Sequence, residues 1–539
     1  MSARVLSIGP LLAGLLATGA LLGGCGAEPE RPRPQHVLLL VIDTLRADHL
    51  SAWGYERPTS PNIDALARRG VRFSRAVSQC SWTSPSMVSL MTSRYLAGPR
   101  LDIPTDVRTL AELFHDAGYA TAAFISNPLL DADNGFHRGF DAVQHIPPYA
   151  PDAPIIEWIE GQADVPTFTY VHLNEAHDPY EPPQGTRRWL LDPPPIPADR
   201  LAFYQDSVPG LADDAGLAEI RRSLAGYDDD VLYCDRRIGA LVGALERTGQ
   251  MDTSAIVLTA DHGEGLWTRF DYFNGPRGQR RREGEAPSLT TSFKMTHGNQ
   301  VSPELVHIPL ILVAPSALGP SAGGQSVTDW VENVDVGPTL LELCGLTDPG
   351  GLQGSSLLRV LEDPEDWPRR KPVVFSATRF VSSVITQAGW QLVLPSLLGE
   401  CQEALIVELF DLNNDPEARH NLAAAHPERV AELTEFVRAR QASGLPGHVD
   451  PNEQTAQHLR GLGYAGNGIM DEPPQELTAL GTAELLALLG DRARACMERL
   501  GSALALETRD LAASEQARLD EILSSEESVV IRRIFDRNR

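Results

Sequence analysis

The chain has 539 residues, of which 42 % are hydrophobic and 22 % are charged, which is the composition of an ordinary globular protein. This length is too great for one simple core and predicts one large domain with smaller units beside it. The formal net charge of −26 excludes nucleic acid as a general partner, because binding to phosphates requires a basic face.

The first 25 residues have the features of a targeting segment. Arg4 supplies a positive charge, and residues 8–22 form an apolar run of about 15 residues, which is short for a bilayer span. The run ends in Leu-Gly-Gly-Cys25, which resembles the bacterial lipoprotein signal, where cleavage precedes a cysteine that is then lipidated. A plain signal peptide and an uncleaved anchor are the alternatives. We expect a lipid anchor at Cys25 in the bacterial cell envelope, facing the periplasm or the exterior.

Residues 26–35 are rich in proline and charge, which predicts an extended tether. The remaining cysteines are scattered along the chain at Cys80, Cys234, Cys344, Cys401 and Cys496. Their spacing forms neither a dense disulfide framework nor a zinc-ligand pattern, so we expect small buried residues. No second transmembrane run follows the first.

From residue 36 onwards, apolar strands alternate with helices. Apolar runs predict strands at 37–42, 119–125, 168–173, 256–259 and 310–313. Capping residues and glycine stops predict helices at 60–70, 109–118, 228–248 and 338–344. This alternation indicates an α/β fold in which helices flank a large, mostly parallel sheet. We assign residues 36–365 to this domain.

After residue 365 the pattern changes to short strands separated by turn residues. The predicted strands are 373–375, 382–386, 390–394 and 406–409, and a helix follows at 427–441. Together they predict a C-terminal subdomain at 366–445, with a small antiparallel sheet beside a helix. The remainder, 446–539, is rich in Leu, Ala and Glu and is expected to be a mainly helical extension.

The segment around Thr83 reads as the start of a helix. Pro85 suits a first helical position and Ser84 is a natural N-cap, so we expect a helix from Pro85 to about Ser93. Thr83 would then lie at a helix N-terminus, where unpaired N–H groups and the dipole favour an anionic oxygen. Taken alone, Thr83 is more often an ordinary capping hydroxyl than a nucleophile.

Polar residues follow several of the apolar strands. Asp43 ends the first strand, Asp261 and His262 follow the strand at 256–259, and His177 lies just beyond the strand at 168–173. Because the carboxyl ends of parallel strands meet at one sheet edge, these residues can converge there with His297. Sites of Asp and His suit zinc or manganese, whereas carboxylate-dominated sites suit calcium or magnesium. A lone Asp or His at such a position is usually structural.

These segments resemble the sulfatase branch of the alkaline phosphatase superfamily over residues 36–440. The resemblance rests on five motifs in the family's order: Val-Ile-Asp43-Thr-Leu-Arg46-Ala-Asp48, Ser-Trp-Thr83-Ser-Pro-Ser86, Asp261-His262-Gly263-Glu264, Val334-Asp335-Val336-Gly337-Pro338-Thr339 and Leu409-Phe410-Asp411-Leu412-Asn413-Asn414-Asp415-Pro416-Glu417. It implies a hydrolase of sulfuric or phosphoric esters that needs a divalent metal ion, namely calcium, zinc or manganese.

The resemblance also implies roles for individual residues. Asp43, Asp261 and His262 would hold the metal ion, and Thr83 would bind it as the nucleophile. His177 and His297 would contact the substrate or a second metal ion and serve in catalysis. The substrate would be an anionic ester, linked to a glycan or a lipid.

The chain departs from the sulfatase pattern at several positions. The family nucleophile is a Cys or Ser oxidised to formylglycine, and Thr83 cannot form that aldehyde. Thr44 replaces the second Asp of the usual pair, Met87 replaces an Arg, and the segment 124–127 stands where Gly-Lys-Trp-His would bind sulfate. A Thr nucleophile resembles the phosphoethanolamine transferases, so the sequence favours phosphate-type esters. The alternatives are such a transferase acting on a lipid or glycan, although its polytopic membrane domain is missing, and a non-catalytic glycan-binding lipoprotein.

An insertion between Glu264 and His297 carries four arginines and two aromatic residues: Arg277, Arg280, Arg281, Arg282, Phe270 and Tyr272. It is either a solvated loop or a lid that attracts anions to the site, since binding loops gather at such edges.

Overall fold

A computed structural model describes residues 33–196, 201, 214–266, 297–298, 300–315, 323–378, 381–395, 407–447, 485–486, 506 and 513–524. Cys25, the tether up to residue 32, the arginine-rich insertion and most of the C-terminal extension lie outside the described residues. Within the described parts, no helix is both long and apolar enough to cross a membrane.

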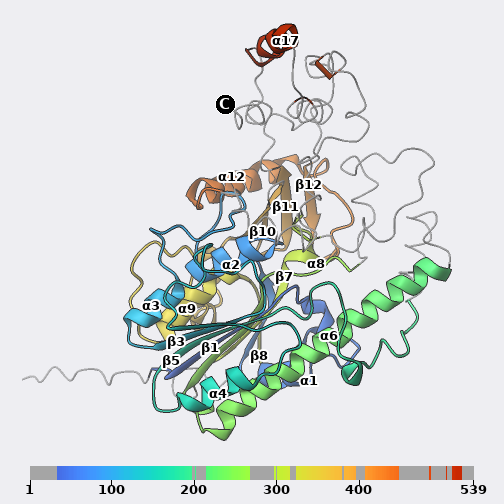
Figure 1. Ribbon diagram of the computed structural model, residues 1–539. Coiled ribbons are helices and arrows are strands. Elements are labelled where there is room, and N and C mark those ends of the chain that lie inside the picture. The colour runs from blue at the N-terminus through green and yellow to red at the C-terminus, as the bar shows by residue number, and fades with distance from the viewer. Residues whose placement is uncertain are drawn as a thin grey trace, which may run out of the picture. The chain divides into compact units, whose positions relative to one another are not determined.

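A large sheet of eight strands forms the centre of the fold (Figure 1). Its strand order is β4-β3-β5-β1-β6-β7-β2-β8. The bounds are β1 His36–Ile42, β2 Val71–Val77, β3 Ala120–Ile125, β4 Ala142–His145, β5 Thr167–Leu173, β6 Ser254–Ala260, β7 His307–Val313 and β8 Gln325–Glu332. The three central strands, β5, β1 and β6, are buried along their whole length, which confirms that their apolar runs lie between two covered faces.

Only β7 runs against its neighbours in this sheet, because it pairs antiparallel with both β6 and β2 while all other pairs are parallel. The predicted mostly parallel sheet is therefore confirmed. The sequence analysis missed β2, β4 and β8. Polar residues interrupt β2 and β8, and all four residues of β4 are exposed, so none of these strands has a continuous apolar run.

Helices cover both faces of the large sheet (Figure 1). One group consists of α1 Pro61–Arg69, α4 Ala153–Gly161 and the long α6 Asp214–Arg247. The other consists of α2 Thr83–Thr92, α3 Leu110–Asp116 and α9 Val336–Leu343. The predicted capping box of Thr109 is present at the start of α3, where its side chain accepts from the Glu112 backbone. Shorter helices are α8 Pro303–Val306, α10 Leu358–Glu362 and α11 Trp367–Arg370, and α17 Ala513–Ser524 lies in the C-terminal extension.

The helix at Thr83 begins earlier than the sequence suggested. α2 starts at Thr83 itself, Trp82 is the N-cap residue, and Ser84 lies buried in the first turn. The first intrahelical bond runs from the Ser86 N–H to the Trp82 carbonyl oxygen. Because first-turn N–H groups have no intrahelical partner, Pro85 is tolerated at the third helical position as well as the first. The prediction of Ser84 as N-cap was therefore wrong.

A second, antiparallel sheet has the strand order β12-β11-β10-β9, and α12 packs against it (Figure 1). The bounds are β9 Val373–Ala377, β10 Val381–Thr386, β11 Trp390–Pro395, β12 Glu408–Asp411 and α12 Pro427–Ser443. This arrangement confirms the predicted small sheet beside a helix.

A buried ionic cluster joins the two sheets, and we call it the Lys371 cluster; it comprises Lys371, Glu332, Asp335 and Tyr95. The Lys371 Nζ lies 2.5 Å from Glu332 Oε2 and 2.6 Å from Asp335 Oδ1. Tyr95 donates its hydroxyl proton to Glu332 Oε2 at 2.6 Å, and the Phe375 N–H of β9 donates to Glu332 Oε1 at 2.5 Å. Every carboxylate oxygen of this cluster has a partner within the protein.

The chain enters the large sheet at the edge opposite the strand ends that carry Asp43 and Asp261. The Tyr119 hydroxyl donates to the Pro34 carbonyl at 2.9 Å. Gln35 donates its N–H to the Thr253 carbonyl at 2.9 Å and accepts from the Thr167 N–H at 2.8 Å. These bonds fix residues 34–35 at the amino ends of β1, β5 and β6.

Candidate active site

Asp43 and Asp261 meet at the carboxyl edge of the sheet because their strands, β1 and β6, are parallel neighbours. Both side chains are fully buried. The residue after Asp43, Thr44, has a φ of 56°, an uncommon conformation for a β-branched residue. This turn directs the Thr44 N–H to Asp261 Oδ1 at 3.1 Å, which links the two strand ends.

Two carboxylate oxygens at this edge face inward without a donor. Asp261 Oδ1 accepts from the Thr44 and His262 N–H groups, and Asp43 Oδ2 accepts from the Asn127 amide at 2.8 Å. Asp43 Oδ1 and Asp261 Oδ2 accept no hydrogen bond of ordinary geometry from the described residues. Because buried polar atoms are rarely left unpaired, these two oxygens are suited to a cation.

His262 presents one ring nitrogen to the same point. Its Nδ1 lies 2.8 Å from the Gly263 carbonyl oxygen, which only accepts, so Nδ1 carries the proton. The lone pair of Nε2 then faces Asp43 Oδ1 at 3.8 Å and Asp261 Oδ2 at 3.5 Å. A histidine whose other nitrogen is fixed in this way has the arrangement typical of a metal ligand.

Thr83 completes this group, which we call the Asp43 cluster: Asp43, Asp261, His262 and Thr83. The Thr83 Oγ1 lies 3.3 Å from His262 Nε2, at the first residue of α2. The helix is held over the strand end by Ser86, whose hydroxyl donates to the Asp261 carbonyl at 2.5 Å. All four members are fully buried. The structure therefore brings together the four residues that the sequence analysis named as metal ligands.

His177 and His297 lie beside this cluster. Their rings are 5.2 Å apart, and the His297 ring is 4.8 Å from that of His262. The His297 Nδ1 lies 3.0 Å from Glu264 Oε1, so it donates its proton to that carboxylate. The His177 Nδ1 lies 2.7 Å from the Asp178 carbonyl oxygen. The sequence analysis named Glu264 only as part of a motif. In the structure its carboxylate pairs with His297 Nδ1 and so orients the His297 ring.

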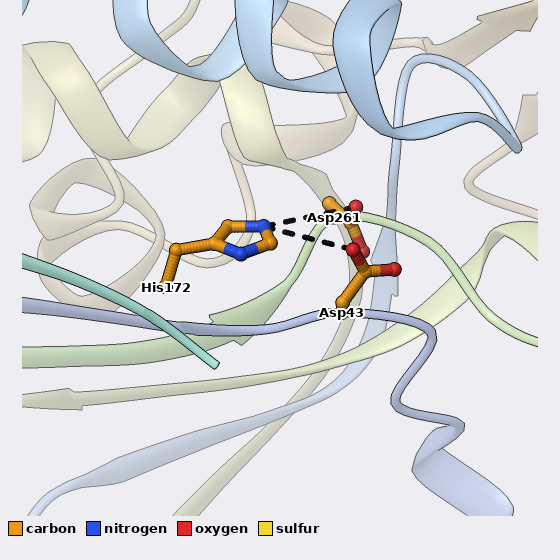
Figure 2. Close-up of side chains that lie close together, drawn as sticks. All are labelled: Asp43, His172 and Asp261. Atoms are coloured by element: carbon orange, nitrogen blue, oxygen red, sulfur yellow. Dashed lines mark ion pairs between the residues drawn. The ribbon is translucent and has the colours of Figure 1, made fainter. Parts of the chain in front are cut away.

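His172 also lies at this edge, although sequence reasoning did not single it out. It is the second-last residue of β5 and is fully buried. Figure 2 shows its ring directed at Asp43 and Asp261, and the Nε2 lies 4.0 Å from an oxygen of each. An imidazole inside an apolar strand is typical of a core residue, so no local pattern marks it. Asp43, His172 and Asp261 form a group with the spacing of metal ligands.

The charges at this edge are set mainly by burial. Burial raises the pKa of Asp261 to about 6, against the lowering effect of the Thr44 and His262 N–H groups. Burial, together with the neighbouring His297, lowers the pKa of His262 to about 4, so its ring is neutral and able to bind a cation. For His297, burial would lower the pKa, but the Glu264 carboxylate outweighs it and raises the pKa above the ordinary value.

Comparison with known proteins identifies the family. The sulfatase family model matches residues 35–346, and the model of the C-terminal region of N-sulphoglucosamine sulphohydrolase matches residues 300–441. The chain belongs to the sulfatase family. It is a sulfatase-like ester hydrolase, and the family is typically metal-dependent. The predicted membership of this branch of the alkaline phosphatase superfamily is confirmed.

Two curated relatives illustrate the similarity of this sulfatase-family chain to known proteins. An N-acetylglucosamine-6-O-sulfatase of Bacteroides thetaiotaomicron is 21 % identical, covering 83 % of this chain and 93 % of its own. A multifunctional alkaline phosphatase superfamily protein of Trinickia caryophylli is 24 % identical over 62 % and 78 % of the two chains. Among solved structures, the phosphonate monoester hydrolase of Agrobacterium radiobacter superposes with a TM-score of 0.58 at 21 % identity, covering 76 % and 96 %. That likeness establishes the shared fold.

Proposed function

We propose that this chain hydrolyses anionic esters with Thr83 as its nucleophile, and that phosphate-type esters are preferred to sulfate esters. The observation that carries the proposal is the position of Thr83. Its hydroxyl lies at the N-terminus of α2, 3.3 Å from His262 Nε2, beside two carboxylate oxygens that accept no ordinary hydrogen bond from the residues that the structure describes. A purely structural capping hydroxyl has no need of such neighbours.

The residues of the Asp43 cluster fit a divalent metal ion. Asp43 Oδ1, Asp261 Oδ2, His262 Nε2 and Thr83 Oγ1 would hold it, and the two carboxylate oxygens have no hydrogen-bond donor in the described part of the chain. When bound, such an ion lowers the pKa of a hydroxyl and neutralises charge on the group being transferred. Calcium, zinc and manganese are the candidate ions.

The chain's own residues supply the remaining chemistry. Thr83 gives its hydroxyl proton to water and its Oγ1 forms a bond to phosphorus, while the bond from phosphorus to the leaving oxygen breaks. The first N–H groups of α2 and the positive end of its dipole favour the negative charge on the transferring group. His177 or His297 gives a proton to the leaving oxygen, and Glu264 holds the His297 ring through its Nδ1. Water then cleaves the phosphothreonine and restores the Thr83 hydroxyl.

The preference for phosphorus follows from the side chain. A formylglycine hydrate releases a sulfuryl group by elimination to the aldehyde, but a threonine ester has no such route. A phosphoryl group carries more negative charge than a sulfuryl group and would therefore gain more from the divalent ion that the Asp43 cluster is proposed to hold. We propose a glycan- or lipid-linked ester as the substrate class. A transferase that passes the group from Thr83 to an acceptor other than water is the second candidate, favoured by the Thr nucleophile.

A chromogenic panel tests this proposal. The purified chain is incubated with 4-nitrophenyl esters of phosphate, phenylphosphonate, methyl phosphate and sulfate, each with zinc, manganese or calcium. We expect turnover of at least one phosphorus ester to exceed that of the sulfate ester by about tenfold or more, which corresponds to about 1.4 kcal/mol in barrier height. Faster turnover of the sulfate ester would contradict the stated preference, and no turnover of any ester would contradict the hydrolase mechanism.

Membrane attachment through Cys25 is a separate proposal, and it rests on the lipobox-like sequence Leu-Gly-Gly-Cys25. Metabolic labelling with an alkynyl palmitate should tag the wild type and not the Cys25→Ala variant. Cys80→Ala is the matched control, because Cys80 is a free, buried cysteine and its loss should leave labelling unchanged. Equal labelling of Cys25→Ala and the wild type would show that the anchor is elsewhere.

A further inference from the structure

His172 lies on the side of the Asp43 cluster opposite His262. It pairs in register with Val41 of β1, two residues before Asp43, so its side chain shares a sheet face with Asp43. His262 Nε2 lies 3.8 Å from Asp43 Oδ1, whereas His172 Nε2 lies 4.0 Å from the other oxygen of that carboxylate, Asp43 Oδ2. Both nitrogens approach Asp261 Oδ2, at 3.5 Å for His262 and 4.0 Å for His172. Figure 2 shows the ring edge, not its face, directed at the two carboxylates.

The ring of His172 has no ordinary hydrogen-bond partner among the described residues. Neither Nδ1 nor Nε2 makes a hydrogen bond there, although the residue has no exposed surface. Buried imidazoles normally satisfy at least one nitrogen. The other buried histidines among the described residues do so; for example, His36 Nδ1 lies 3.1 Å from Thr167 Oγ1, and His49 Nδ1 lies 2.8 Å from Asp228 Oδ1. An unpaired nitrogen aimed at two carboxylates therefore points to a shared cation.

The residue next to Asp43 cannot supply this further donor. The Thr44 hydroxyl lies 2.7 Å from the carbonyl oxygens of both Asp43 and Ala176, and its N–H is used by Asp261. With a φ of 56°, Thr44 is turned toward these partners. The Asp43 cluster thus offers four protein donors, and His172 is the residue placed to add another.

We propose that His172 Nε2 is a direct ligand of the ion held by the Asp43 cluster, and that this second imidazole makes the site select zinc or manganese over calcium. The inference rests on the proposed metal site and concerns its ligands and ion class. Two atoms bound to one ion at about 2.0–2.2 Å lie at most about 4.4 Å apart. Between the ligand atoms named above, the 4.0 Å distance from His172 Nε2 to Asp261 Oδ2 and the 3.5 and 3.8 Å distances of His262 Nε2 meet this limit.

Donor chemistry gives the selectivity. Calcium takes oxygen ligands, usually six to eight of them, and gains little from imidazole. Two imidazole nitrogens, two carboxylates and a hydroxyl form the mixed set that suits zinc and manganese. Removing one imidazole should therefore weaken zinc binding far more than calcium binding.

The full chain, stripped with a chelator and reloaded with zinc, provides the test. The zinc K-edge X-ray absorption spectrum of the wild type should show the multiple scattering of two imidazoles, and that of His172→Phe should show one. Phenylalanine keeps the ring volume and removes both nitrogens. His36→Phe is the matched control, because it changes a buried histidine at the opposite end of the neighbouring strand.

Titration gives the second measurement. We expect the zinc Kd of His172→Phe to rise by ~100-fold or more, because even changes to groups outside the ligand shell cost about 10–100-fold. The zinc Kd of His36→Phe should stay within about threefold of the wild-type value, since His36 is neither a proposed ligand nor in contact with one. The wild type should also hold zinc against excess calcium, and His172→Phe should do so less well.

The spectrum and the titration can each overturn the assignment of His172 as a ligand. One imidazole in the wild-type spectrum overturns the ligand assignment, and this result does not depend on whether His172→Phe folds. A variant that keeps the wild-type zinc Kd overturns it as well. A wild type that binds neither zinc nor manganese overturns the proposed metal site itself, whereas loss of turnover with two imidazoles still present would affect only the catalytic proposal.

Discussion

The Asp43 cluster and the Lys371 cluster are both buried and acidic, yet they are built differently. In the Lys371 cluster, Lys371 supplies a cation to Glu332 and Asp335, and every carboxylate oxygen has a partner in the protein. In the Asp43 cluster two carboxylate oxygens have no ordinary donor, and no Lys or Arg is paired with them among the described residues. A buried charge must be compensated. The Lys371 cluster is therefore a buried salt-bridge network with a structural role, and the Asp43 cluster is suited to bind a ligand.

The largest expected effect concerns turnover at the Asp43 cluster. Thr83→Ala should lower kcat by several powers of ten, because loss of a nucleophile removes the covalent route. The free energy of unfolding should change little, since only a hydroxyl is removed, and metal content should be retained at saturating metal because the other proposed ligands are unchanged. Steady-state kinetics and elemental analysis check this. Retention of more than about a tenth of the rate, a loss under about 1.4 kcal/mol, would make Thr83 only a helix residue.

The reverse result is expected at the Lys371 cluster. Lys371→Met leaves two buried carboxylates without their cation and should lower the free energy of unfolding by about 3–5 kcal/mol. Turnover per folded molecule should stay at the wild-type level. Arg359→Met is the matched control, because Arg359 is half exposed and pairs with Glu342 on the surface, where such pairs contribute about 0–1 kcal/mol. Equal losses of unfolding free energy in the two variants would show that the buried Lys371 cluster contributes no more than a surface ion pair.

The Lys371 cluster should also give stability a dependence on pH. Burial raises the pKa of Asp335 to about 6 against the opposing effect of Lys371, and the nearby Glu332 adds to the rise. The folded state then binds more protons than the unfolded chain between about pH 4 and pH 6, so stability falls as the pH rises through this window. Over this window the wild type should lose unfolding free energy relative to Asp335→Asn, which does not titrate at this position. Urea unfolding at several pH values measures the difference, and parallel curves would contradict it.

The smallest expected effect is at the Asp43 cluster, where the difference in unfolding free energy between Asp261→Asn and the wild type should change sign when metal is added. Without metal, Asp261→Asn should equal or exceed the wild type in unfolding free energy by up to about 2 kcal/mol, because it removes an uncompensated buried charge. With metal present the order should reverse, because the wild type gains the binding free energy. Thermal unfolding in the presence of a chelator checks the order of stability without metal, and thermal unfolding with zinc checks the order with metal. A less stable variant under both conditions would mean that the protein alone satisfies Asp261.

The sequence predicted those parts of the fold that a single pattern marks. The apolar runs of β1, β5 and β6 located the central strands, and the polar residues after them located Asp43, Asp261 and His262. β2 was missed because Arg72, Ser74 and Arg75 interrupt its apolar pattern. Strands of this kind are defined by their neighbours in the sheet, and one sequence does not show those neighbours.

The site shows the same limit. His172 has an inward position only because β5 lies beside β1 in a particular register, so its approach to Asp43 depends on strand order. The orienting contact between Glu264 and His297 joins residues 33 positions apart, across the arginine-rich insertion. The start of α2 was placed too late because Pro85 suits either the first or the third helical position. Local rules named the chemical groups, and tertiary structure decided which of them meet.

The entry of the chain at the amino edge of the sheet has a consequence for where substrates come from. Residues 34–35 are fixed at one end of β1 and Asp43 follows the other end, so the seven residues of this strand separate them by about 23 Å. The segment before residue 34 therefore joins the domain on the side opposite Asp43, so substrates reach the edge that carries Asp43 from the side away from this point of attachment.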